Sequence, residues 1–249
     1  MAIGLLLAAT GTAPAQTGDA PAPLPSLRPL HLALHPSVEL DRLTPLLDDR
    51  ATFARLRRAA ELTLDLAILA EDDPDGRVRL LEEAESYARQ ALELRPGDLD
   101  ARFLMGAAMG LRVQYMPTRA KMRMAERIQS ISDAILAEDP THAGGLHLRG
   151  QLNAAAMRLS ALERFIGRTV LGGGTLGDAS WETAEQSFRG AIRSEPDNPA
   201  HRWELARVLR DTGREDEARA ELRTLLDMDG HQELLAFYRA KARAALRPD

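Results

Sequence analysis

A short helix-ending phrase occurs three times in this chain and constrains the fold more than any other feature. Residues 91–96, 135–140 and 191–196 each begin with two apolar residues and end with a charged residue followed by proline. Proline cannot continue a helix, so each phrase marks the end of one. Residues that can begin the next helix follow each time, and these are Asp98, Thr141 and Asn198 with Pro199. The chain is therefore predicted to repeat a helical unit.

Apolar residues recur at helical spacing between these marks. One stripe lies within 53–68 and stops at the turn-forming residues 72–76, and the next lies within 80–92. The composition agrees, because 41 Ala and 40 Leu stand against 5 Val and 7 Ile. Alanine and leucine favour helices, whereas β-branched residues suit sheets. We therefore expect an all-α fold.

A small residue (Gly106, Gly150 and Ala206 in turn) lies inside the helix after each start, where it lets a partner helix approach closely. The final unit resembles a tetratricopeptide repeat (TPR) at the positions Trp203, Leu205, Ala206, Gly213, Ala218, Leu222 and Leu225. The resemblance implies a right-handed solenoid, because one such unit cannot bury its apolar face alone. We expect the domain at 37–249, with helical hairpins near 50–96, 99–140, 142–196 and 199–229 and a capping helix near 232–246.

The middle repeats carry insertions, since the three prolines lie farther apart than a TPR of about 34 residues allows. The insertions fall around 111–124 and 160–181. With residues 117–121, 164–166 and 184–196, this order of features resembles bacterial relatives of the regulator of microtubule dynamics proteins, from about Arg50 to Leu246. Microtubule binding is not carried over, because an exported bacterial protein would meet no microtubules.

The first fifteen residues have the pattern of a secretory signal peptide. A short apolar core at 3–9 precedes small residues at 13–15, and cleavage is expected after Ala15. No Lys or Arg precedes the core, and the alternative is an apolar tail. Residues 16–36 are rich in proline and small residues, as in an extended linker. The sequence therefore predicts a periplasmic or secreted protein without a transmembrane segment.

The charge and the residue inventory exclude several function classes. With 32 basic and 37 acidic residues the net charge is −5, which gives no overall attraction to nucleic acid. The chain has no Cys, and its six histidines lack the spacing of a zinc-binding helix. No catalytic arrangement is found, so we expect no enzyme, no cofactor and no metal site.

One glycine-rich stretch, Gly172 to Gly177, matches the G-x-G-x-x-G pattern of dinucleotide sites. Such a site requires a preceding strand within a parallel βαβ unit, and the sequence offers neither. A loop between helices is the favoured interpretation. A nucleotide-binding enzyme is the alternative, and a thermal shift with NAD or ATP would reveal it.

Three arginines, Arg119, Arg123 and Arg127, form a stripe at i, i+4 and i+8 of a predicted helix. A solvated helix face is the simpler interpretation of such a charge run. The alternative is a contact with anions or lipid headgroups, through which the solenoid would dock on an anionic membrane.

TPR solenoids usually bind extended peptides on the face formed by the first helix of each hairpin. By this resemblance, the residues of such a face would be His147, Gln151, Trp203, Arg207 and Arg210. Arg207 and Arg210 are able to pair with acidic groups, while Trp203 is equally suited to a core position between repeats. The leading hypothesis is a non-enzymatic adaptor in the cell envelope that binds a protein or peptide partner.

Overall fold

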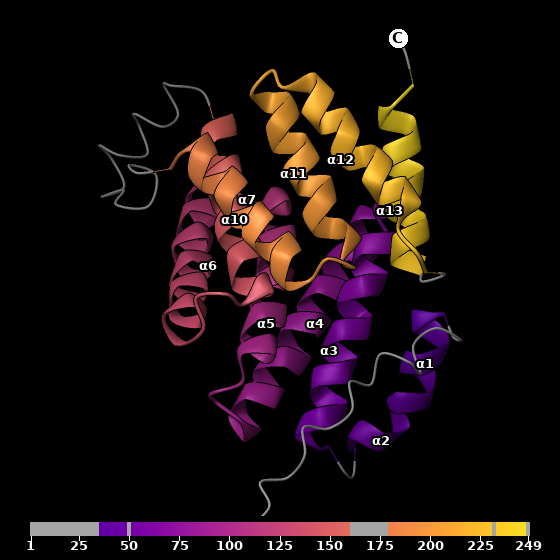
Figure 1. Cartoon of the computed structure of the whole chain (residues 1–249). Coiled ribbons are helices and arrows are strands. Elements are labelled where there is room, and N and C mark those ends of the chain that lie inside the picture. The colour runs from indigo at the N-terminus through magenta and orange to yellow at the C-terminus, as the bar shows by residue number, and fades with distance from the viewer. Residues whose placement is uncertain (1–34, 49–50, 160–178, 231–232, 248–249) are drawn as a thin grey trace, which may run out of the picture.

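The computed structural model describes residues 35–48, 51–159, 179–230 and 233–247. Within these ranges all regular secondary structure is helical (Figure 1). The all-α expectation is therefore confirmed. The α-helices are α1 (Pro36–Leu43), α2 (Pro45–Asp48), α3 (Phe53–Leu69), α4 (Pro74–Leu94), α5 (Leu99–Arg112), α6 (Thr118–Glu138), α7 (Ala143–Arg158), α10 (Trp181–Ser194), α11 (Pro199–Asp211), α12 (Glu215–Asp227) and α13 (Glu233–Ala245).

The helices pack in chain order, as in a solenoid. Four pairs, α3 with α4, α5 with α6, α7 with α10 and α11 with α12, pack within themselves and against the pair that follows. The first helices of the pairs also contact one another, from α3 through α5 and α7 to α11. We call these four helices the inner layer. Within the described ranges, no helix is both long and apolar enough to cross a membrane.

Side-chain caps set where the helices begin. The carboxylate of Asp98 accepts a hydrogen bond from the Ala101 amide at 2.8 Å, as expected for a helix start. Asn198 caps α11 and Pro199 is the first helical residue, also as expected. The expectation for Thr141 was wrong, because its hydroxyl donates to Asp139 and His142 is the cap of α7 instead.

Small residues allow the pairs to pack closely. A β-carbon at Gly150 would lie 2.8 Å from the ring of Phe188, so the close contact of α7 with α10 requires glycine there. Phe188 is fully buried in the largest apolar cluster, which joins α7, α10, α11, α12 and α13. Gly213 adopts a φ of 76° between α11 and α12, a conformation that glycine adopts without strain.

The first expected insertion is a helical extension. α5 ends at Arg112, a 3₁₀ turn covers Val113–Tyr115, and α6 then runs for 21 residues. Most of the second insertion, residues 160–178, lies outside the described residues, and the glycine-rich stretch 172–177 lies there too.

Candidate functional site

Helix α13 contacts both ends of the inner layer. It packs against α12 and α11, and it also contacts α3 at the other end of the solenoid (Figure 1). The inner layer therefore runs from α3 to α11 and is closed by α13. The residues expected to bind a partner lie on this layer, and α13 contacts the helices at both of its ends.

Lys241 of α13 makes the contact with the first hairpin. Its Nζ lies 2.7 and 2.6 Å from the two carboxylate oxygens of Glu71, which follows α3. The same ammonium lies 5.5 Å from the ring centroid of Trp203 and 5.0 Å from that of Phe237, within the range of cation–π attraction. One side chain thus links the first hairpin with α11.

Two of the residues expected to bind a partner are already in contact with α13. The rings of Trp203 and Tyr238 lie 6.4 Å apart between their centroids. Arg210 donates a hydrogen bond to the backbone carbonyl of Ala245 at 3.1 Å, and it also pairs with Glu215. The C-terminal helix of this chain therefore contacts part of the expected partner-binding face.

The surroundings of Tyr238 are enclosed and acidic. Burial raises the pKa of the Tyr238 hydroxyl, and the nearby carboxylates of Glu204, Asp65 and Glu71 raise it further. Asp65 is half-buried as a residue, yet removal of its carboxyl from water, together with the charge of Glu61, raises its pKa to about 8. Acidic groups of α3 and α11 therefore lie around one aromatic side chain of α13.

Two further expected residues lie on α7 and α11. Arg207 pairs with Glu204 at 3.0 Å, and its side chain is 45% exposed while that of Glu204 is 12% exposed. Gln151 is half-buried on α7. Both residues keep surface that a partner is able to reach.

His147 occupies an interior position between α7 and α11. Its Nδ1 lies 2.8 Å from Nδ1 of His201, and the two residues are 7% and 1% exposed. Burial lowers the pKa of His147 well below its ordinary value, and the nearby His201 adds to this effect. A side chain this buried joins the two helices and is not displayed on the surface.

The histidine pair also approaches a carboxylate. Nε2 of His201 is buried and lies 3.6 Å from a carboxylate oxygen of Glu195, beyond hydrogen-bond distance. The contact between the two Nδ1 atoms makes the pair a polar link between the third and fourth hairpins.

A second polar link ties the earlier hairpins together. Arg57 of α3 pairs with Asp100 of α5 at 2.7 Å, and His142 Nε2 lies 3.3 Å from the same carboxylate. The hydrogen bond with His142 lowers the pKa of Asp100, and it raises that of His142. These groups serve the packing of α3, α5 and α7.

The arginine stripe of α6 is exposed to solvent. Arg119, Arg123 and Arg127 are all exposed, and no ion pair joins them to any acidic residue in the described ranges. Arg112, just before the stripe, differs because it pairs with Glu82 at 3.0 Å and Glu85 at 2.6 Å. The stripe therefore presents three positive charges on one helix.

The described part of the chain holds no group of three or more His, Cys, Asp or Glu residues placed to hold a metal ion. A recess of about 280 Å³ lies between α4, α5 and α6, and Arg102 is its one charged lining residue. The guanidinium of Arg102 already donates to the Pro96 carbonyl and pairs with Glu138.

Sequence reasoning missed Lys241, Glu71, Tyr238, Asp65 and His201. These residues come together only through the fold, and four of them lie where α13 meets α3 and α11. One signal was available for Lys241, because the chain contains only two lysines, Lys121 and Lys241.

Comparison with solved structures places the fold. A thermophilic TPR protein of Thermus thermophilus aligns with a TM-score of 0.58 at 19% identity, covering 85% of this chain and 90% of that chain. A MamA protein of Desulfovibrio magneticus RS-1 aligns at 15% identity and a TM-score of 0.42, covering 78% of this chain and 85% of that one. The first likeness confirms a TPR-like solenoid and concerns the fold alone.

Comparison of sequences identifies the relatives. Regulator of microtubule dynamics protein 1 of Caenorhabditis elegans is 33% identical over 90 residues, which are 36% of this chain and 40% of that protein. The chain thus matches less than half the length of this curated relative. The family model described as regulator of microtubule dynamics protein 1-3 matches residues 41–246, most of the chain. The chain therefore belongs to the regulator of microtubule dynamics protein 1-3 family.

Proposed function

We propose that this protein is a non-enzymatic adaptor that binds a segment of a partner protein on its inner layer. A TPR-like fold and this family suggest a protein-interaction scaffold. One observation carries the finer proposal: α13 packs on Trp203 and Arg210, two residues that the TPR resemblance assigns to a partner. A face that holds a helix of its own chain has the shape and the polar groups to hold a peptide.

Arg207 is the residue we expect to contribute most to partner affinity. Its guanidinium is exposed while its carboxylate partner, Glu204, is largely covered, so one side of the guanidinium stays available. Arginine pairs with carboxylates through two parallel hydrogen bonds, which favours an acidic group on the partner. Gln151 adds a neutral polar contact on α7.

The test begins with crosslinking in the native cells and mass spectrometry, which identify the partner. Its affinity is then measured for Arg207→Glu and for Arg223→Glu, an exposed arginine on α12. We expect Arg207→Glu to weaken binding at least about tenfold, about 1.4 kcal/mol, and Arg223→Glu to leave it unchanged. Helical circular dichroism should match wild type for both. Equal affinity of the two variants would refute the proposed face.

We also propose that the protein acts in the cell envelope after export. The sequence pattern of residues 1–15 supports this location. N-terminal sequencing of the protein purified from the periplasm or the medium should begin at Gln16. Recovery in the cytoplasmic fraction with Met1 retained would contradict export.

The arginine stripe supports a second candidate function, docking on an anionic membrane. Its three exposed charges lack ion pairs within the described ranges, and an anionic surface would satisfy them. The Arg119, Arg123 and Arg127→Ala triple variant should lose partitioning to phosphatidylglycerol vesicles. The matched control replaces Arg193, Arg223 and Arg243, which are exposed on other helices. Unchanged partitioning of the stripe variant would eliminate this function.

A further inference from the structure

Helix α13 buries fewer of its residues than its neighbour α11 does. Both helices have 13 residues, but α11 buries seven of them, whereas α13 buries only Leu235 and Ala242. Gly230, with a φ of 135°, lies in the connection before α13. Segments with few buried apolar contacts open locally at a lower free energy than core helices.

The surface that α13 covers is acidic and aromatic. It consists of Asp65 and Glu71 from the first hairpin and Trp203 and Glu204 from α11, and we call these four residues the acidic inner face. From α13, Tyr238 and Lys241 contact it. Lys241 pairs with Glu71 and Arg207 pairs with Glu204, while Asp65, whose pKa is raised to about 8, keeps its proton at neutral pH. Glu71 is therefore the carboxylate of this face that a cationic group of a helix can pair with.

We propose that α13 is an internal occupant of the acidic inner face, and that a basic amphipathic helix of a partner protein displaces it. The inference rests on the proposed function, because it names the partner class and a step that controls access to the same layer. The chemistry of the partner follows from α13, where Leu235, Tyr238 and Lys241 recur every three residues. Such spacing places an apolar, an aromatic and a cationic side chain along one side of a helix.

Attachment to the chain gives α13 an advantage over any free helix. A short tether provides an effective concentration in the millimolar range, so the closed form dominates. A free helix binds only the open fraction, and its apparent dissociation constant is the intrinsic one divided by that fraction. Weakening the contact of α13 should therefore strengthen binding of a free helix.

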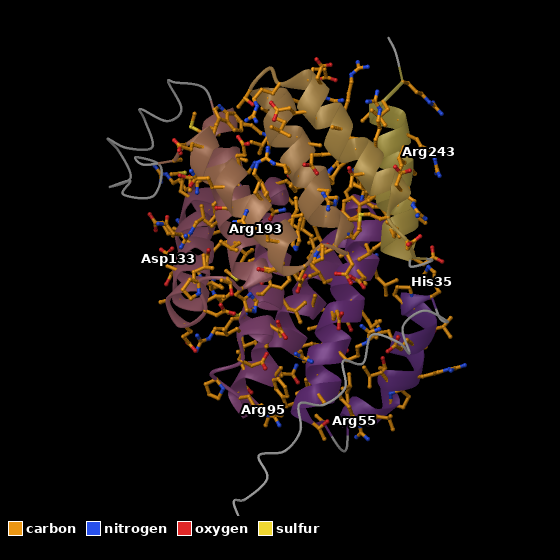
Figure 2. All side chains as sticks on the ribbon, viewed as in Figure 1. His35, Arg55, Arg95, Asp133, Arg193 and Arg243 are labelled. Carbon is orange, nitrogen blue, oxygen red and sulfur yellow. The ribbon has the colours of Figure 1, made fainter. Side chains whose placement is uncertain are left out.

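The experiment uses a fluorescent peptide of residues 231–247 and the full chain. Binding is measured by fluorescence anisotropy with wild type, with Lys241→Glu, and with Arg243→Glu, whose arginine lies at the outer edge of α13 (Figure 2). We expect Lys241→Glu to bind the peptide at least about tenfold more tightly than wild type. Arg243→Glu should bind it as wild type does. Equal affinity of Lys241→Glu and wild type would overturn the proposal.

A charge exchange tests whether the peptide occupies the same face. Glu71→Lys weakens the contact of α13 and that of the wild-type peptide alike, so in this variant a peptide that carries Lys241→Glu should bind more tightly than the wild-type peptide. Equal affinity of Glu71→Lys for the two peptides would show that the peptide is not held at the acidic inner face, and would contradict the proposal.

Hydrogen exchange provides a readout on the unmodified protein. We expect amides of 233–245 to exchange at least about tenfold faster than the core amides of α11, because α13 opens separately. Equal protection of both helices would show that α13 is a fixed cap, and would overturn this inference alone. The adaptor proposal would then still stand if Arg207→Glu weakens binding of the crosslinked partner. Conversely, if the peptide binds as expected but Arg207→Glu does not weaken binding of the crosslinked partner, the displacement of α13 would still stand and the partner-binding role of Arg207 would be refuted.

Discussion

Two of the interfaces made by the inner layer differ in chemistry. The junction between α7, α10 and α11 is mostly apolar, with Phe188, Leu205 and Leu209 fully buried around the His147–His201 pair. The closure of α13 onto α3 and α11 depends on the half-exposed Lys241–Glu71 pair and on aromatic contacts. Apolar burial stabilises strongly and is insensitive to salt, whereas exposed ion pairs contribute little and are screened. We therefore expect the junction to stay packed under conditions in which α13 separates from α3 and α11.

The largest expected effect on stability comes from a substitution that leaves a cavity in the junction. Phe188→Ala should lower the free energy of unfolding by about 3–5 kcal/mol, because it removes a fully buried ring and leaves a cavity. The matched change at the closure is Phe237→Ala, on a half-buried ring, and it should cost about 1 kcal/mol. Urea unfolding followed by circular dichroism measures both. Equal losses would show that the two interfaces do not differ.

The next effect concerns the pH dependence of the closure. The pKa of Asp65 is raised from 3.8 to about 8, so the folded chain keeps a proton that the unfolded chain releases near pH 4. Stability should therefore fall as the pH rises from 4 to 8. Asp65→Asn cannot ionise, and at pH 8 it should be more stable than wild type by more than about 1.4 kcal/mol. Melting temperatures between pH 5 and 8.5 measure the difference, and parallel curves for both proteins would contradict it.

The junction should respond in the opposite direction. His147 stays neutral in the folded chain because its pKa is lowered by burial. Below pH 6.5 the unfolded chain binds a proton that the folded chain does not, so stability falls as the pH decreases. His147→Gln should remove up to about 1.4 kcal/mol of this loss for each pH unit below 6.5. The same melting series extended to pH 5 shows it, provided that the variant retains helical circular dichroism.

The difference between these interfaces also explains what the sequence was able to predict. The starts at Asp98 and Asn198 and the small residue at Gly150 depend on neighbours within a turn or within one hairpin, and local patterns reveal them. The prediction for Thr141 was wrong because its hydroxyl donates to Asp139, and His142, one residue later, caps the helix. Cap choice among adjacent polar residues depends on the backbone path, which a pattern does not specify.

The contacts of the candidate site were hidden for a different reason. His147 and His201 are 54 positions apart, and Lys241 and Glu71 are 170 apart. Such pairs depend on how far the solenoid curves, and the curvature is the sum of small rotations between successive repeats. The insertions change those rotations, so the TPR pattern places His147 and Trp203 on the inner layer but does not show that one is buried and the other lies beside α13.

The smallest expected effect is the removal of the ion pair at the closure. Glu71→Gln keeps the shape of the side chain and should lower the free energy of unfolding by only about 0.2–1 kcal/mol, because both partners are partly exposed. The effect should shrink further in 0.5 M NaCl, where screening acts over a few ångströms. Hydrogen exchange should locate the loss in α13 and leave the protection of α10 and α11 unchanged. A loss spread evenly over all helices would mean that the closure and the junction open together, and the contrast between them would have no consequence for binding.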